Sequence, residues 1–302
     1  MVDQYTLRRF DEAGPEAIQE ALERSEVVYF ERSPVPMPSA EDLAFLREEL
    51  PKQHTVKNVS YHPESDSIPR FEASAEIQER TKQILKSHRA DVEAFFRRNA
   101  PDWTPGWTVG TSSFRAVEEK GRDLKPRSNN EIVHIDAGAY GATNGNRILR
   151  FFVNVNPSVD RVWGTKGSFA ELFSTQQAFV AAARGKHDRI RLQKSVGDKL
   201  FSGVVHGLSK VYPLLQVIDS SPYDRAMRRI HNYMKDTESF RNDTTGYKEI
   251  RFPPYSAWSV FTDGISHSAV SGQFALITTL LIPLENMGQP ELAPYNILAA
   301  AS

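Results

Sequence analysis

A histidine and an aspartate two positions apart, His134 and Asp136, are the residues of this sequence best suited to hold a metal ion together. On a β-strand, residues i and i+2 point to the same side, so the imidazole and the carboxylate can share one ion while Ile135 points away. A later histidine, His267, lies in a predicted turn before the last predicted strand, where an antiparallel neighbour can bring it back to the pair. These three residues form one candidate ligand set.

Two histidines and one carboxylate leave three positions of an octahedron open, which is the arrangement that non-haem iron(II) oxygenases use. The sequence contains no cysteine, which excludes disulfides, iron–sulfur clusters, thiolate zinc sites and cysteine nucleophiles. Metal chemistry must therefore use His, Asp and Glu. A His-x-Asp pair is a weak motif by itself, and a surface strand with two polar side chains is the simpler explanation when the pair is taken alone.

The predicted strand from Arg147 to Asn156 places a charged group close to this pair in sequence. Its alternating positions give one apolar column, which holds Leu149, Phe151, Val153 and Val155, and an opposite column, in which Arg150, Asn154 and Asn156 accompany Ile148 and Phe152. Because guanidinium pairs bidentately with carboxylate, Arg150 is our first candidate for the far carboxylate of 2-oxoglutarate. An edge strand with its polar face in water is the alternative.

Composition limits the class of protein. The 302 residues are 40% hydrophobic and 25% charged, which suits one large core or two modest ones. Acidic and basic residues nearly cancel, 38 against 37, so the global charge does not indicate a nucleic-acid partner. The first twelve residues lack the apolar run of a secretory signal, and the longest apolar stretch, Phe274 to Pro283, is about half of the roughly 20 residues that a membrane-spanning helix needs. We expect a cytoplasmic protein.

The order of predicted elements indicates an α+β protein with one β core. Residues 1–105 are predicted to be mainly helical support, with short strand-like pieces and helix starts at Ser39 and Ser74. Strands are predicted at 107–118, 147–156, 247–252, 257–262 and 273–282. A helical insert at 167–245, with a helix start at Ser221-Pro222, separates the β segments 106–166 and 246–285. We expect a single domain over 1–302 whose core is a double-stranded β-helix, or jelly roll, braced by the N-terminal helices.

Several ordered segments of the sequence resemble the Kdo 3-hydroxylase family. They are Ser113-Phe114-Arg115-Ala116-Val117-Glu118, His134-Ile135-Asp136-Ala137, the run from Arg147 to Pro157, Phe252-Pro253-Pro254, Phe261-Thr262-Asp263, His267 and the run from Ser271 to Leu276, together with a helix that holds His231, Met234 and Lys235. The resemblance covers about residues 105 to 285. It implies an Fe(II)-, 2-oxoglutarate- and O2-dependent dioxygenase that hydroxylates carbon 3 of Kdo, the acidic sugar attached to lipid A in lipopolysaccharide. It also implies that His134, Asp136 and His267 are the iron ligands.

The sequence departs from the expected pattern at two places. Many 2-oxoglutarate enzymes carry an Arg or Lys about ten residues after the distal histidine, but position 277 is Ile277. The anchor of the co-substrate is therefore expected elsewhere, at Arg150 or Arg147, with Asn154 as a further cofactor-binding candidate, and the alternation favours Arg150. The loop after Asp136 also differs, so its Tyr140 is a candidate substrate contact. The other substrate-binding candidates are Arg115, Arg127, Arg161 and His231.

The sequence also contains a basic segment that could contact a membrane, and it leaves three alternative functions open. Residues 184–199 carry six basic and two acidic residues, a net charge of +4, ahead of the apolar run 200–204. This pairing fits peripheral contact with the cytoplasmic face of the inner membrane, and a solvated helix and loop is the alternative. The alternative functions are a 2-oxoglutarate oxygenase of another substrate, a zinc hydrolase with the same ligands, and a non-catalytic sugar-binding jelly roll.

Overall fold

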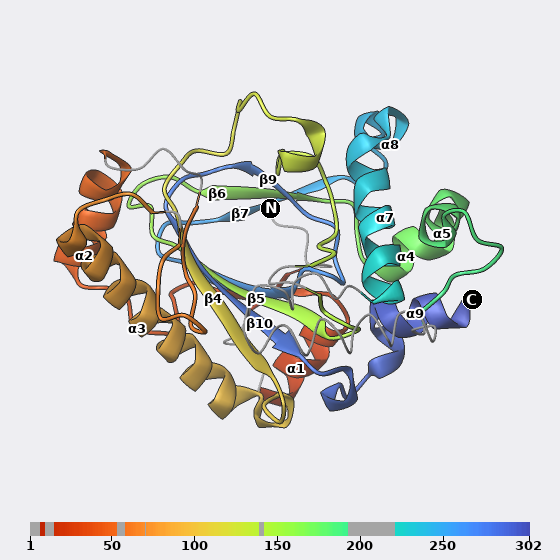
Figure 1. Cartoon of the computed structure of the whole chain (residues 1–302), viewed down its shortest axis with the longest axis horizontal. Helices are drawn as coiled ribbons and strands as arrows, with labels where there is room; N and C mark the ends of the chain where they lie inside the picture. The colour runs from red at the N-terminus through yellow and green to blue at the C-terminus, as the bar shows by residue number, and fades with distance from the viewer. Residues whose placement is uncertain (1–6, 10–14, 53–57, 70, 139–141, 193–220) are drawn as a thin grey trace.

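The computed structural model describes residues 7–9, 15–52, 58–69, 71–138, 142–192 and 221–302 (Figure 1). These residues form a mixture of helices and mainly antiparallel sheet, arranged as a large sheet, a smaller sheet and helices at their edges. None of the helices among them is long and apolar enough to cross a membrane.

Seven strands of the described chain form the large sheet, in the order β1-β2-β8-β5-β10-β4-β3. They are β1 (Leu7–Arg9), β2 (Val27–Phe30), β3 (Asn58–Tyr61), β4 (Thr108–Arg115), β5 (Arg147–Asn154), β8 (Ala257–Phe261) and β10 (Ala275–Ile282). All neighbours except β1 and β2 pair in antiparallel fashion. Every residue of the central strand β5 is buried except Arg150, which is half-buried, so the polar group that the sequence places there lies inside the protein.

The smaller sheet has three strands in the described residues, in the order β7-β6-β9. These are β7 (Lys248–Phe252), β6 (Arg161–Thr165) and β9 (Ser268–Ser271), and both pairs are antiparallel. Aromatic side chains join the two sheets. The rings of Phe152 on β5 and Trp163 on β6 meet edge to face at 4.8 Å, and those of Trp258 on β8 and Phe252 on β7 stack at 3.8 Å. Such contacts hold the sheets face to face.

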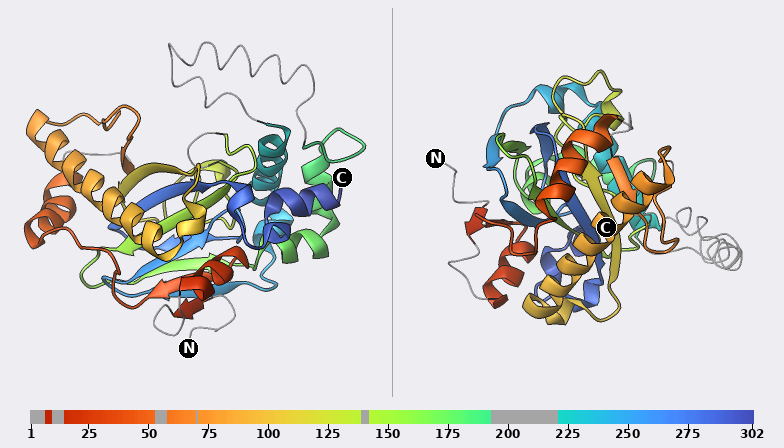
Figure 2. Two further views of the ribbon diagram at one scale, coloured as in Figure 1. Left: turned by 90° about the horizontal axis from the view of Figure 1, so that it is seen from below. Right: turned by 90° about the vertical axis from the view of Figure 1, so that its left-hand side faces the viewer.

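Three N-terminal helices belong to the predicted support region: α1 (Pro15–Glu23), α2 (Ala40–Ala44) and α3 (Ala75–Asn99). The side chains of Ser39 and Ser74 accept the N-terminal amide hydrogen bonds of α2 and α3, which confirms both predicted helix starts. Helix α3 runs along the large sheet (Figures 1 and 2) and packs Phe95 and Phe96 against Phe151 of β5, with ring centroids 5.9 and 6.1 Å apart. The outer face of the sheet is thereby covered.

Helices of the insert and of the C-terminus gather at the other end of the molecule (Figure 1). They are α4 (Phe169–Thr175), α5 (Gln177–Arg184), α7 (Pro222–Asp236), α8 (Glu238–Asn242) and α9 (Pro294–Ala300). Ser221 and Asp224 form a reciprocal capping box at the start of α7, as the sequence predicts. Ile135 belongs to the apolar cluster that α7 makes with α4 and α5, so this helix packs behind the His134–Asp136 segment.

Two features of the strands differ from the sequence expectation. The short strand-like pieces of the N-terminal region extend the β core itself, because β2 pairs with β8 and β3 pairs with β4. Strand β9 was not predicted, since its sequence Ser-Ala-Val-Ser is too short and too polar for the pattern rules. The predicted strands that correspond to β4, β5, β7, β8 and β10 are all present, and no end is shifted by more than three residues.

Candidate metal centre

His134 and His267 lie opposite each other in an isolated antiparallel bridge at the edge of the smaller sheet. The amide of His134 donates to the carbonyl of His267 over 2.9 Å, and the amide of His267 donates back over 2.7 Å. The amide of Asp136 donates to the carbonyl of Thr262. The prediction that an antiparallel neighbour brings the later histidine back to the pair is confirmed.

The side chains of His134, Asp136 and His267 converge on one point. One ligand atom from each lies within 4.8 Å of the other two, and this is the only such group of three or more His, Asp or Glu side chains in the described residues. The Nε2 atoms of His134 and His267 are 3.8 and 3.9 Å from the Asp136 carboxylate oxygens. These separations are too long for hydrogen bonds, but one ion with bonds of about 2.1 Å can bridge them.

The second nitrogen of each imidazole fixes how the ring presents itself. His134 Nδ1 lies 2.8 Å from the carbonyl of Ile132, and His267 Nδ1 lies 3.1 Å from the carbonyl of Ile265. A carbonyl can only accept, so each Nδ1 carries the proton and each Nε2 keeps its lone pair. Both Nε2 atoms are therefore ready to bind a cation, in the way that backbone carbonyls orient metal-binding histidines.

The charge states of the three groups also suit a metal ion. Burial lowers the pKa of His134 well below its usual value and lowers that of His267, so both rings are neutral near pH 7. Burial opposes the ionisation of Asp136, yet the charge of the Arg150 guanidinium holds its pKa below the usual range. The set thus offers two neutral nitrogens and one carboxylate.

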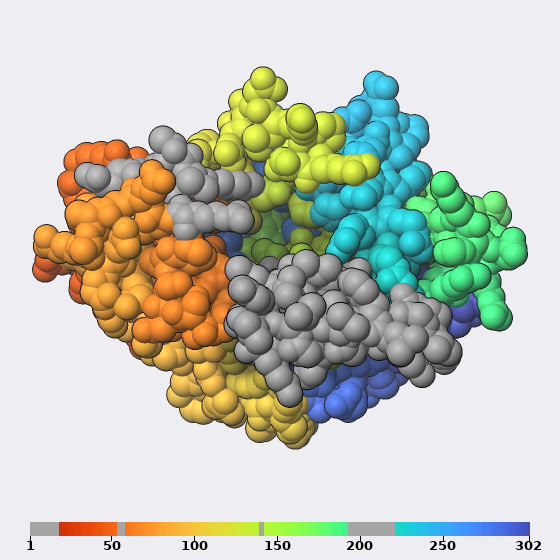
Figure 3. Space-filling model, viewed as in Figure 1, coloured from red at the N-terminus to blue at the C-terminus, as the bar shows by residue number. Residues whose placement is uncertain are grey.

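A cavity of about 220 Å³ opens in front of the three side chains. Its wall consists of Asn58, Arg115, Asn130, Arg150, Phe152, Arg161, Trp163 and Ala269, besides the candidate ligands. The ring of Trp163 stacks on His267 at 5.1 Å and an angle of 22°. Figure 3 shows a hollow between the yellow-green segment that carries His134 and the cyan helix α7, with strands at its floor.

Arg150 projects from β5 into this cavity, on the side of the strand that the alternation predicts. Its Nη2 lies 3.0 Å from Asp136 Oδ2, but the two are not aligned as a hydrogen bond, and its Nε has no hydrogen-bond partner among the described residues. The other two cofactor candidates do not line the cavity. Arg147 is buried on the opposite face and pairs with Asp263 over 2.7 Å, and the Asn154 amide donates to the carbonyls of Val159 and Phe252. Both therefore have structural partners.

Two of the substrate-binding candidates line the cavity. Arg115 on β4 and Arg161 on β6 both pair with the buried carboxylate of Glu119. Burial, followed by the charge of Arg115, lowers the pKa of Arg161 to about 10, so it stays protonated near neutral pH. Both guanidinium groups therefore stay charged beside the cavity, with Glu119 paired to both and Glu118 also acting on Arg161.

Among the described residues, the substrate candidates Arg127 and His231 are not part of the cavity wall. Arg127 is largely exposed and pairs with Asp236 over 2.6 Å. His231 packs edge to face on His134 at 5.2 Å and donates from Nδ1 to the carbonyl of Ile135. Tyr140 lies outside the described residues, as do Lys194, Lys199 and the apolar run 200–204 of the basic segment.

Sequence reasoning missed three side chains that shape the site. Glu119 was not identified because its two arginine partners are four and 42 positions away, and neither spacing is a motif. Trp163 lies on β6, a short strand that was not predicted from the sequence. Lys235 had been noted only as part of a resembling helix; its Nζ donates to the carbonyl of Asn129, and burial lowers its pKa to about 8.

Comparisons with known proteins identify the family. Residues 8–302 match the family described as 3-deoxy-D-manno-oct-2-ulosonic acid (Kdo) hydroxylase. Among solved structures, the chain is similar to the Kdo hydroxylase KdoO, described as a non-haem Fe(II) α-ketoglutarate-dependent dioxygenase, in its apo form (26% identity, TM-score 0.77) and with cobalt(II) (25%, 0.79). It is likewise similar to KdoO with α-ketoglutarate and Fe(III) (25%, 0.78), and each comparison covers 98% of this chain and 95% of the other. The search of curated proteins found no match.

Proposed function

The chain belongs to the Kdo hydroxylase family, and we propose that His134, Asp136 and His267 are the iron ligands with which it works. It is an Fe(II)- and 2-oxoglutarate-dependent dioxygenase that hydroxylates Kdo. We further propose carbon 3 of the sugar as the position and Kdo-lipid A as the acceptor. The assignment of these residues rests on one observation. The Nε2 atoms of His134 and His267 and the carboxylate of Asp136 converge in a cavity that is lined by arginines.

The chain order of the strands supports a double-stranded β-helix. The segments β4, β5, β8 and β10 belong to the large sheet, whereas the His134 bridge, β6, β7 and β9 belong to the smaller sheet or its edge. Along the chain the path alternates between the sheets: β4, the bridge, β5, β6 and β7, β8, β9, β10. Such alternation between two face-to-face sheets is the winding of a jelly roll. We infer that these eight segments form it, and that β1 to β3 are additions.

The donor set fits iron(II). Two imidazoles and one carboxylate are the facial ligands that leave three positions for co-substrate and dioxygen. When bound, the iron supplies oxidative chemistry that couples the decarboxylation of 2-oxoglutarate by dioxygen to the hydroxylation of the sugar. The chain itself keeps the ligands in register: the backbone bridge fixes the two histidines, and Ile132 and Ile265 orient their rings. Phe152 and Trp163 exclude water from one side.

We assign the far carboxylate of 2-oxoglutarate to Arg150. The guanidinium lines the cavity beside Asp136, and its Nε has no hydrogen-bond partner in the described chain, so it retains a donor for a carboxylate. Arg147 is unsuitable because it is committed to Asp263 behind the sheet.

The sugar carboxylate is assigned to Arg115 and Arg161. Their guanidinium groups line the cavity, together with Asn58 and Asn130. Kdo is an acid, and a guanidinium group pairs bidentately with a carboxylate, so these two arginines are the candidates for the sugar's acid group. Substrate and co-substrate would then occupy separate guanidinium groups. A cytoplasmic location with peripheral attachment to the inner membrane is a proposal of the same kind, because the acceptor is anchored in lipid.

The decisive assay loads the protein anaerobically with Fe(II) and 2-oxoglutarate and starts the reaction with oxygen in the presence of Kdo-lipid A. We expect one oxygen atom in the product per succinate formed, with the hydroxyl at carbon 3 by NMR. His134→Ala should abolish both products, while His187→Ala, which changes an exposed histidine, should leave them unchanged. Succinate without sugar product would reject this acceptor. No succinate from iron-loaded protein would reject the oxygenase and favour a sugar-binding protein.

A further inference from the structure

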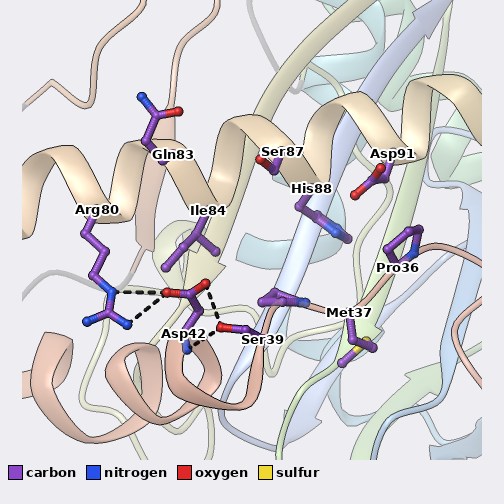
Figure 4. A pocket seen from close by; sticks show the side chains of 11 residues that line it. Pro36, Met37, Ser39, Asp42, Arg80, Gln83, Ile84, Ser87, His88 and Asp91 are labelled. Carbon is purple, nitrogen blue, oxygen red and sulfur yellow. Dashed lines mark hydrogen bonds and ion pairs between the residues drawn. The ribbon is translucent and has the colours of Figure 1, made fainter.

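A second cavity, of about 310 Å³, lies between helix α3 and the segment that leads into α2 (Figure 4). It is on the opposite face of the large sheet from the metal centre. His88 in its wall contacts the ring of Phe151, 6.5 Å away, and Phe151 points away from the strand face that carries Arg150. The hydroxylase site proposed above does not use this cavity, whose volume is at the small end of the range for ligand pockets.

His88 is a buried polar group without a partner. Its side chain points from α3 into the cavity, it is 2% exposed, and neither ring nitrogen has a hydrogen-bond partner among the described residues (Figure 4). Burial lowers the pKa of His88 to about 4, so the ring is neutral near pH 7 and offers one donor and one acceptor. Buried polar groups are nearly always hydrogen-bonded, which makes a missing partner informative.

Asp91 lines the same cavity one helical turn further along α3. Residues three apart on a helix face the same side, and Figure 4 shows the carboxylate near the His88 ring. In the described part of the chain, no hydrogen bond or ion pair engages the Asp91 carboxylate, and burial raises its pKa. The acceptor nitrogen of His88 and the carboxylate of Asp91 thus lie on the same side of α3.

The remainder of the wall consists of one arginine–aspartate ion pair and of uncharged side chains. At the far end, the Arg80 guanidinium is occupied by Asp42 and by Glu41, at 3.0 and 3.1 Å. The side chains of Met37 and Ile84 supply apolar surface between the ends. Because the charges of Arg80 and Asp42 cancel, the net charge of the wall is the negative charge of Asp91.

We propose that this cavity binds a small organic ammonium compound, with the ammonium at Asp91 and His88 and its carbon chain against Met37 and Ile84. A primary ammonium has three donors, of which one can reach the carboxylate and one the acceptor nitrogen. An anion would meet the carboxylate without a compensating cation. A metal ion would find only two protein ligands, which is fewer than stable sites use.

The test uses n-butylamine with the full-length protein, followed by thermal unfolding and by 15N NMR of the histidine rings. We expect the amine to raise Tm and to shift the His88 signals in a saturable way, whereas n-butanol and butyrate at the same concentration should not. Asp91→Asn should weaken the affinity for the amine by about tenfold or more, as expected for the loss of a charge-assisted hydrogen bond. Glu76→Gln, which removes an exposed charge from the same helix, should not.

Three outcomes would overturn the proposal. They are no amine-dependent shift of His88, an equal response to n-butanol, or unchanged amine affinity in Asp91→Asn. Any of these would leave ordered water as the partner of His88. Because the readouts do not involve turnover, they are independent of whether the hydroxylase assignment holds.

Discussion

At the scale of single residues, position along a strand decided which polar groups could be identified from the sequence. His134 and Asp136 share a side because they are two apart, and Arg150 faces the cavity because it alternates with Leu149 and Phe151. The same parity put Arg147 on the apolar side, where it pairs with Asp263. Glu119 could not be found this way, since its role depends on two arginines brought together only by the fold.

We assigned the far carboxylate of 2-oxoglutarate to Arg150 and the sugar carboxylate to Arg115 and Arg161. Replacing arginine with lysine tests this, because lysine keeps the charge but cannot form two parallel hydrogen bonds. We expect Arg150→Lys to raise KM for 2-oxoglutarate by about tenfold at saturating iron, with little effect on KM for Kdo-lipid A. Arg161→Lys should show the reverse. Steady-state kinetics with each substrate varied in turn measures both. A larger 2-oxoglutarate effect in Arg161→Lys would move the anchor to β6.

His88 should make the protein sensitive to acid. Its pKa is about 4 when folded against 6.5 in the unfolded chain, so below pH 6.5 the unfolded state binds a proton that the folded state does not. Stability is therefore full above pH 6.5 and declines as the pH falls toward 4, by about 3 kcal/mol from this group. Denaturant unfolding at pH 7 and at pH 4 measures the loss of stability on acidification. We expect this loss to be smaller by about 3 kcal/mol in His88→Met than in the unchanged protein. An identical pH dependence in the variant would contradict the burial argument.

At the scale of elements, side-chain caps marked helix starts reliably, whereas short polar strands escaped detection. Ser39, Ser74 and Ser221 each accept the amide hydrogen bond expected of an N-cap. Strand β9 owes its existence to pairing with β6, a long-range contact that four small residues cannot announce. The bridge that joins His134 to His267 is also a long-range contact. The sequence therefore indicated that the two histidines meet, but not the backbone hydrogen bonds that join them.

Asp224 links the start of α7 to the loop that follows the metal centre. Its carboxylate accepts from Ser221 at the cap and from the backbone amides of Thr143 and Asn144. Asp224→Ala should lower the free energy of unfolding by about 2 kcal/mol or more, because it removes a cap and leaves buried amides unpaired. Denaturant titration measures the change. Asp236→Ala, at the exposed end of α7, serves as control and should cost much less.

At the scale of the whole molecule, the sequence predicted the composition of the fold better than its extent. The separation into N-terminal helices, β segments and a helical insert followed from local periodicity. The recruitment of β1 to β3 into the large sheet did not, since strands of three or four residues acquire their register only from the neighbours they join. The cavity of the metal centre depends on both sheets at once and therefore has no local signal.

Metal binding should stabilise the entire chain, because the three ligands come from segments that are joined only in the folded state. Anaerobic addition of Fe(II) at about 100 times its Kd should add about 2.7 kcal/mol, which raises Tm by several degrees. Chelation should reverse the shift, and His267→Ala should show none. An equal Tm shift in this variant would place the metal elsewhere.

The most direct measurement is a crystal structure with cobalt(II) and 2-oxoglutarate, with the metal located by its anomalous scattering. The account predicts one metal bonded to Nε2 of His134, Nε2 of His267 and the carboxylate of Asp136, with the far carboxylate of 2-oxoglutarate at Arg150. A metal bound away from these three side chains would contradict the central claim.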